Sequence, residues 1–288
     1  MINFSLEYFP PNDQESLKSL IEQATVISTY SPHYMSITHT ANPMVNNPTM
    51  QTVEILKKQL AVRVTPHMTC INYSKTEIMQ MVQDYSSLGV DSVVALRGNK
   101  KHNDRENEPY FDNSPEFISA LNDNFDFRIS ISGYPEGHPE RKGIIADFLY
   151  LKKKCDAGAD EIITQWCFSN DAVLRYRDLC ASRNINVPIS IGILPISDME
   201  KTQHFAKLCG SVIPREIKEA FNKSEGNDKA TEDLGVRVAI QQIENLSNEG
   251  IYNFHLYTLN RSEMTKRIIQ HFAVPRIDEI ARSEMRAS

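Results

Sequence analysis

Eight short apolar runs, each followed by a segment of different character, most constrain how this 288-residue chain can fold. The runs are rich in β-branched residues and stop at polar residues, glycine or proline, which is typical of buried strands. Strands that are apolar on both faces and alternate with helices are typical of a parallel sheet covered by helices. The eight runs are Phe4–Phe9, Tyr34–Thr38, Val62–Cys70, Ser92–Gly98, Arg128–Tyr134, Glu161–Phe168, Pro188–Leu194 and Asn253–Leu259.

Two of the intervening segments show the helical character clearly. Residues 74–89 predict a helix that Ser74 or Thr76 caps at its start and Gly89 ends. Residues 138–160 predict a second helix with one broad apolar face, followed by three lysines and a glycine stop. The apolar positions of that face are Ile144, Ile145, Phe148, Leu149 and Leu151.

Eightfold alternation of strand and helix predicts an α/β fold, a (β/α)8 barrel. The main rival is a doubly wound open sheet, but such a sheet normally carries a Gly-rich dinucleotide turn. The chain has 11 glycines and neither G-x-G-x-x-G after its first strand nor a P-loop. In the absence of a linker or an internal repeat, we expect residues 1–288 to form one catalytic domain. The polar stretch 99–114 is expected to be a long loop over the barrel mouth.

Net charge, apolar runs and cysteine content limit the kinds of partner and compartment that fit this chain. A net charge of −6 gives no general attraction to nucleic acid or to an anionic membrane. The sequence has no signal-like start, and no apolar run approaches the ~18 residues that span a bilayer. Its five scattered cysteines contain no C-x-x-C pair, which fits a reducing cytoplasm.

In a barrel of this kind the chemistry lies at the carboxyl ends of the strands, and these ends are rich in polar groups. A carboxylate such as Glu7, within the first run, is costly to bury ionised, so two interpretations stand: an ion pair with an arginine, or a general acid of raised pKa. His67 is equally either a hydrogen-bonded core histidine or a ligand contact. The strand-end groups are Glu7, Thr38, His39, His67, Thr69, Arg97, Gly98, Asn99, Tyr134, His138, Gln165, Pro195, Thr258, Asn260 and Arg261.

Other chemistries have less support. The histidine spacing predicts no metal site, and no G-x-S-x-G or activated cysteine indicates a nucleophile. The run Lys152–Lys154 is either a solvated helix end or a source of one phosphate contact. These residues alone indicate a cytoplasmic barrel enzyme, without naming a substrate.

The strand ends together resemble a known family. The motifs LEYFPP, SITHTAN, PHMTC, VALRGN, YPEGHPE, KKKCDAGADEIITQ, GILPI and HLYTLNR occur in the order found in bacterial methylenetetrahydrofolate reductases, from about residue 4 to about residue 275. The resemblance implies an FAD-dependent (β/α)8 barrel that self-associates. In this family NADH or NADPH reduces the flavin by a ping-pong scheme, and the flavin then reduces 5,10-methylenetetrahydrofolate to 5-methyltetrahydrofolate. The resemblance also leaves open a member that oxidises methyltetrahydrofolate in one-carbon catabolism or demethylation, or a folate- or flavin-binding protein with impaired turnover.

Residue roles follow from the same resemblance. Glu7 matches the family's acid, which protonates N10 of the substrate, and Asn99 stands at a catalytic position beside the flavin. Gln165, Phe205 and Arg261, with Glu7 and Asn99, match folate or nicotinamide contacts; Phe205 is suited to stacking and Arg261 to the glutamate tail. The positions that match FAD contacts are Thr38, His39, Ala41, His67, Arg97, Gly98, Asn99, Tyr134, His138, Asp147 and Lys154.

Several positions depart from the bacterial pattern. Tyr150 replaces a common Asn, Lys201 replaces a common Gln, and His39-Thr40 and Trp166-Cys167 replace Tyr-Gly and two phenylalanines. The largest departure is Asn99, where the family usually has Asp. An amide keeps the hydrogen-bonding capacity of the acid but drops its charge.

We predict that the flavin of this chain is easier to reduce than in a variant with the usual acid. A carboxylate at position 99 disfavours the anionic reduced flavin by charge repulsion, so Asn99→Asp lowers the flavin midpoint potential. Redox titration of both proteins checks this, and an unchanged or higher potential in the variant would contradict it. Asp104, Glu106 or Glu108 in the following loop could instead restore the missing charge.

Overall fold

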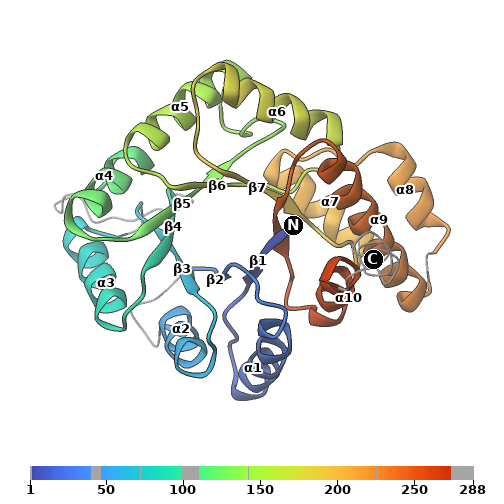
Figure 1. Ribbon diagram of the computed structural model, residues 1–288, viewed down its shortest axis with the longest axis horizontal. Helices are drawn as coiled ribbons and strands as arrows, with labels where there is room; N and C mark the ends of the chain where they lie inside the picture. The colour runs from blue at the N-terminus through green and yellow to red at the C-terminus, as the bar shows by residue number, and fades with distance from the viewer. Residues whose placement is uncertain are drawn as a thin grey trace, which may run out of the picture.

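The computed structural model describes residues 2–39, 47–71, 73–98, 110–141, 143–224 and 226–273. Eight parallel strands follow one another around a closed barrel, and β1 pairs with β8 as well as with β2 (Figure 1). The expected fold class, a (β/α)8 barrel, is therefore confirmed. The strands are β1 (Asn3–Tyr8), β2 (Met35–Ile37), β3 (Val64–Thr69), β4 (Ser92–Leu96), β5 (Arg128–Gly133), β6 (Glu161–Thr164), β7 (Ile189–Ile193) and β8 (Asn253–Tyr257).

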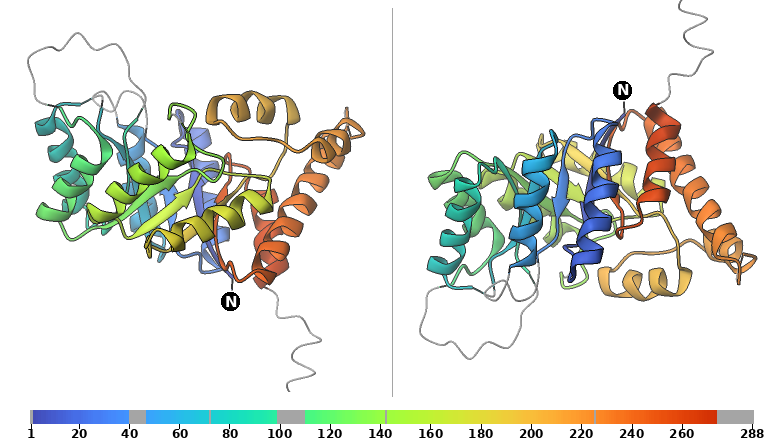
Figure 2. Two further views of the ribbon diagram at one scale, coloured as in Figure 1. Left: turned by 90° about the horizontal axis from the view of Figure 1, so that it is seen from above. Right: turned by 90° about the horizontal axis from the view of Figure 1, so that it is seen from below.

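Helices surround the strands as an outer ring (Figure 1). Between β7 and β8 the chain forms three helices, and the side views place α7 at the end of the barrel opposite the N-terminus (Figure 2). The helices are α1 (Gln14–Ser28), α2 (Pro48–Gln59), α3 (Lys75–Ser87), α4 (Ser114–Asn124), α5 (Ile144–Asp156), α6 (Asn170–Ser182), α7 (Met199–Cys209), α8 (Arg215–Asn222), α9 (Asp228–Asn248) and α10 (Ser262–Ala273). No helix among the described residues is long and apolar enough to cross a membrane.

All eight predicted strands exist, but several end earlier than their apolar runs. The sixth run was expected to reach Phe168, whereas β6 stops at Thr164. Trp166 and Phe168 leave the barrel and pack in a separate cluster with Leu194 and Ile196 after β7. A run of buried apolar residues therefore extended beyond the strand because a second core begins where the first one ends.

Helix α3 forms as the sequence predicts. The Ser74 side chain accepts a hydrogen bond from the backbone N–H of Glu77, and the Glu77 carboxylate accepts one from the backbone N–H of Ser74. This reciprocal capping satisfies donors that the first helical turn leaves free. Gly89, just past the end, has a φ of +73°, a conformation that glycine adopts without steric cost.

Helix α5 differs from its prediction in two ways. It begins at Ile144, not near His138, because residues before Gly143 form turns and Gly143 has a φ of +89°. The prediction of one broad apolar face is also wrong, because three of its residues are exposed: Ile144 by 46%, Ile145 by 61% and Leu149 by 55%. The buried stripe instead joins Phe148 and Leu151 to two charged residues, Asp147 and Lys154, which face the barrel mouth.

Helix α9 packs in close contact with the segment that follows β7. A Cβ atom at Gly235 would lie 2.0 Å from the carbonyl oxygen of Ile196 and 2.9 Å from the Met264 side chain. Backbone atoms cannot yield as a flexible side chain does. A residue without a side chain is therefore required at this helical position.

We predict that Gly235→Ala destabilises the protein although alanine is the better helix former. The helical preference of alanine favours the variant by about 1 kcal/mol, whereas the clash forces a backbone shift that costs about 3 kcal/mol. Denaturant unfolding should show a net loss of about 2 kcal/mol. Gln241→Ala, on the exposed side of the same helix, is the control, and an unchanged or increased stability of Gly235→Ala would contradict the prediction.

Candidate functional site

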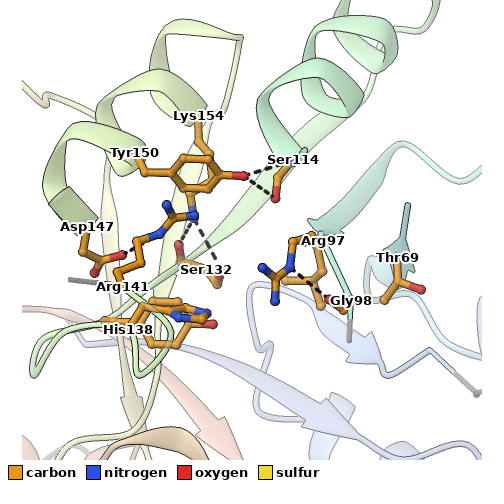
Figure 3. Close-up of a pocket in the computed structure, with 12 residues that line it drawn as sticks. Thr69, Arg97, Gly98, Ser114, Ser132, His138, Arg141, Asp147, Tyr150 and Lys154 are labelled. Atoms are coloured by element: carbon orange, nitrogen blue, oxygen red, sulfur yellow. Dashed lines mark hydrogen bonds and ion pairs between the residues drawn. The ribbon is translucent and has the colours of Figure 1, made fainter. Parts of the chain in front are cut away.

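Two pockets open at the carboxyl ends of the strands. The first, called the polar pocket, has a volume of about 310 Å³ and is bordered by the ends of β3, β4 and β5 and by α5 (Figure 3). The second, called the apolar pocket, has a volume of about 410 Å³ and lies between β1, β6, β8 and α7. Tyr134 of the polar pocket and Gln165 of the apolar pocket also border one small cavity, which places the two pockets side by side.

Three cationic side chains line the polar pocket. Arg97, after β4, donates to the Glu140 carboxylate at 2.6 Å. The Arg141 guanidinium lies against the Tyr150 ring, 3.5 Å from the ring centre (Figure 3). Lys154 is buried and its ammonium group donates to the backbone carbonyl of Ser132. This cluster of fixed N–H donors is suited to an anion such as a phosphate group.

Of the three consecutive lysines of α5, Lys154 is the one that lines the polar pocket. Its ammonium group points into the polar pocket, whereas the half-exposed Lys152 pairs with Asp156 outside. Burial lowers the pKa of Lys154 to about 8, and the neighbouring Asp147 opposes that shift. Burial likewise raises the pKa of Asp147, against the attraction of Lys154, His138 and Arg141.

Backbone shape at Gly98 brings the chain close to the polar pocket. Gly98 has a φ of +85°, and a Cβ atom there would lie 2.8 Å from Cβ of Thr69. The positive φ and the missing side chain let the main chain after β4 pack closely against Thr69 at the end of β3. Nearby, the rings of Tyr134 and His138 meet edge to face with centroids 4.5 Å apart.

Glu7 is the only ionisable group that β1 contributes to the apolar pocket. Its side chain is 14% exposed, and burial raises its pKa from 4.5 to about 8. The carboxyl oxygen lies 3.6 Å from Nε2 of His67, whose pKa burial lowers to about 3, with smaller effects from His255 and His39. Both groups are therefore neutral at pH 7, and their separation is longer than a hydrogen bond.

The ion-pair interpretation of Glu7 is thus wrong among the described residues, where no arginine or lysine pairs with it. The general-acid interpretation requires a raised pKa, and burial raises the pKa of Glu7 to about 8. His67 is buried and its Nε2 has no hydrogen-bond partner among the described residues. It therefore faces Glu7 rather than serving as a satisfied core histidine.

Four further residues of the apolar pocket come from three elements. Gln165 and Trp166 follow β6, Phe205 extends from α7 and is 44% exposed, and Tyr257 ends β8. The Tyr257 hydroxyl donates to the carbonyl of Thr164 at 3.0 Å, which fixes its ring against the pocket. Aromatic and apolar walls with few polar groups are suited to a flat, partly polar ring.

The structure brings most of the predicted site residues together. Glu7, Gln165, Phe205 and Arg261 share the apolar pocket. Thr38 and His39, just after β2, line neither of the two pockets. The His39 ring lies 3.1 Å from the Tyr73 hydroxyl. Two predicted residues, Ala41 and Asn99, lie outside the described residues. The polar pocket contains Arg97, Gly98, Tyr134, His138, Asp147 and Lys154.

Arg141 and Tyr257 are two of the pocket residues that sequence reasoning missed. Arg141 lies in the same Pro-rich segment as His138 and could have been found as a nearby basic residue. Tyr257 belongs to the HLYTLNR motif but was hidden among apolar strand residues. Within the described parts of the chain, no group of three His, Cys, Asp or Glu side chains could hold a metal ion.

A closed (β/α)8 barrel with a cationic and an apolar pocket at its strand ends defines a barrel enzyme with a composite site. A family model described as methylenetetrahydrofolate reductase matches residues 1–273. The 5,10-methylenetetrahydrofolate reductase of Escherichia coli strain K12 is 35% identical to this chain, and the alignment covers 95% of this chain and 91% of the relative. The enzyme of the same name from Pectobacterium carotovorum is 34% identical, with the same coverage of both chains. The Arabidopsis thaliana protein named methylenetetrahydrofolate reductase (NADH) 1 is 30% identical, and the match covers 97% of this chain and 50% of that protein.

The chain belongs to the methylenetetrahydrofolate reductase family, and the resemblance seen in its motifs is confirmed. It is therefore an oxidoreductase that acts on CH–NH groups. Among solved structures, a Clostridium thermocellum protein described as binding two copies of 5-methyl-5,6,7,8-tetrahydrofolic acid aligns with a TM-score of 0.63 at 17% identity, covering 94% of this chain and 95% of that one. At that identity the likeness shows the fold alone.

We predict that Glu7→Gln stabilises the protein, increasingly so as pH rises. Because the Glu7 pKa is 4.5 when unfolded and about 8 when folded, the unfolded state ionises first, and wild-type stability falls between those pH values. The gain in the variant should be under about 1 kcal/mol at pH 5 and about 3 kcal/mol at pH 7. Urea unfolding at several pH values measures it, with exposed Glu22→Gln as control, and a pH-independent difference would contradict the prediction.

Proposed function

We propose that this chain is an FAD-dependent methylenetetrahydrofolate reductase in which NADH or NADPH and then the folate use the apolar pocket in turn, by a ping-pong scheme. The observation that carries the proposal is a carboxyl group kept protonated at pH 7, in an apolar pocket next to a cationic one. We further propose that residues 1–288 act as one catalytic domain, in the cytoplasm and as a homo-oligomer, as the sequence predicts.

The residues of the polar pocket fit the diphosphate of FAD. Arg97, Arg141 and Lys154 supply positive charge. Nε of Arg141 is buried without a hydrogen-bond partner among the described residues, although it lies 3.5 Å from an Asp147 carboxylate oxygen. Gly98 lines the same pocket and has no side chain that could project into it. Arg97, His138, Arg141 and Lys154 would hold this cofactor. FAD, when bound, supplies hydride transfer between nicotinamide and folate.

Glu7 supplies the proton that opens the five-membered ring of the substrate. The bond between the one-carbon unit and N10 breaks, and its electron pair stays on N10, which takes the Glu7 proton. The lone pair of N5 then forms a double bond to the one-carbon unit, and the carbon of this iminium can accept a hydride. An amine leaves poorly unless it is protonated. A carboxyl with an ordinary pKa would be ionised at pH 7, whereas burial keeps this one protonated.

Other residues orient the substrate. Trp166 and Tyr257 are suited to enclose the pterin ring, Gln165 to hydrogen-bond its edge, and Phe205 to stack against the nicotinamide or the folate. Arg261, at the rim, is suited to a carboxylate of the glutamate tail. The roles of Asn99 and Ala41 beside the flavin rest on the sequence alone, as do those of Thr38, His39 and His67.

We predict that Glu7→Gln separates the two half-reactions. Reduction of the flavin by NADH needs no proton from Glu7, so its rate should stay within a fewfold of wild type. Reoxidation by methylenetetrahydrofolate should slow by about 10²- to 10⁴-fold because the general acid is lost. Anaerobic stopped-flow absorbance of the flavin measures both steps.

The same assay tests the proposed function itself. Wild-type protein should be yellow, bleached by NADH or NADPH, and restored by methylenetetrahydrofolate. Equal slowing of both steps in Glu7→Gln would contradict the role of Glu7. Bleaching by methyltetrahydrofolate but not by a nicotinamide would indicate the oxidising alternative, and a colourless protein without folate-dependent redox change would contradict both.

A further inference from the structure

Two cationic side chains stand on the rim of the apolar pocket, and they come from different parts of the chain. Lys201 belongs to the first turn of α7 and is 74% exposed, whereas Arg261 precedes α10 and is 49% exposed. Both line the same pocket as Glu7, whose carboxyl is neutral at pH 7. The pocket therefore combines an uncharged, aromatic interior with two positive charges at its opening.

Each cation is held in place by one carboxylate. The Lys201 ammonium lies 3.1 Å from Asp198, and an Arg261 Nη1 hydrogen donates to Glu232 at 3.0 Å. An ammonium has three N–H donors and a guanidinium has five, so both retain donors for a ligand. The carboxylates thus fix the cations at the rim without exhausting their hydrogen-bonding capacity.

Asp198 can release the Lys201 ammonium at low cost. It caps α7 by accepting the backbone N–H of Lys201 at 2.9 Å, and this bond together with the side-chain contact lowers its pKa. Because the helix N-terminus continues to stabilise the Asp198 charge, the ammonium is free to turn towards a ligand. Exposed ion pairs of this kind contribute little stability and exchange readily.

We propose that Lys201 and Arg261 form a two-cation clamp for a dicarboxylate, the terminal glutamate of the folate, with Lys201 as a specificity-determining residue. The proposal rests on the proposed function, which places the pterin ring inside the apolar pocket. A glutamate end carries two carboxylates, so the planar Arg261 fork takes one and the flexible Lys201 ammonium takes the other. The usual glutamine at this position would offer an amide without the charge.

The test uses purified flavin-containing protein and isothermal titration calorimetry. The ligands are 5-methyltetrahydrofolate and the matching pteroate that lacks the glutamate. Lys201→Gln should weaken the folate about fivefold and leave the pteroate unchanged, because only the folate presents the second carboxylate. Added salt should reduce the difference, since the groups are exposed.

Lys207→Gln is the matched control. It removes the same charge from the same helix, but Lys207 does not line the pocket, so both ligands should bind as to wild type. Equal weakening of folate and pteroate by Lys201→Gln, or no weakening of the folate, would overturn the clamp. Fluorescence of Trp166, the single tryptophan of the chain and a residue of this pocket, gives an independent binding signal.

The outcome is separable from that of the reductase proposal. If Lys201→Gln weakens binding of the folate but not of the pteroate, the clamp is supported, even in a protein without NADH-linked turnover. The absence of that turnover would contradict only the reductase proposal. Normal turnover with a folate affinity that Lys201→Gln leaves unchanged would overturn the clamp alone.

Discussion

Exclusion of water from the Glu7 carboxyl is the interaction on which the proposed chemistry depends. Side chains alternate along β1, so the fully buried Leu6 and Tyr8 face the surrounding helices while Glu7 faces the barrel interior. Closure of the barrel through β8 then removes solvent from a group that would otherwise ionise near pH 4.5. A rise in pKa of this size makes the folded protein less stable at neutral pH. The cost is typical of a residue retained for function rather than for stability.

In the polar pocket, unlike around Glu7, the buried groups are charged and must be stabilised as ions. Lys154 and Asp147 lie on the buried stripe of α5, seven residues apart, and each offsets part of the other's desolvation. The Lys154 ammonium also donates to a backbone carbonyl of β5. An apolar stripe would pack α5 more favourably against the barrel. The charged stripe instead keeps donors directed at the pocket, where an anionic group would complete their hydrogen bonding.

The sequence was sufficient to predict the barrel, because eight β-branched runs and the Ser74 cap are local signals. It could not identify the buried face of α5, since five apolar residues at helical spacing look the same whether they face a core or solvent. It also could not decide between the two interpretations of Glu7. That choice depends on which side chains from β3 and β8 surround the carboxyl, and these strands are distant in sequence. Tyr257 was missed for the same reason, because its neighbours in space and not its own motif place it in the apolar pocket.

Helix α9 connects the packing of the barrel to the rim of the apolar pocket. Glu232 and Gly235 are three residues apart, so they lie on one face of the helix. At Gly235 this face touches the carbonyl of Ile196, two residues before Asp198, which caps α7 and holds Lys201. At Glu232 it holds Arg261. The close approach allowed by Gly235 fixes α9 against the segment that leads into α7. One face of α9 therefore sets the positions of both Lys201 and Arg261, although these residues are 60 positions apart in the chain.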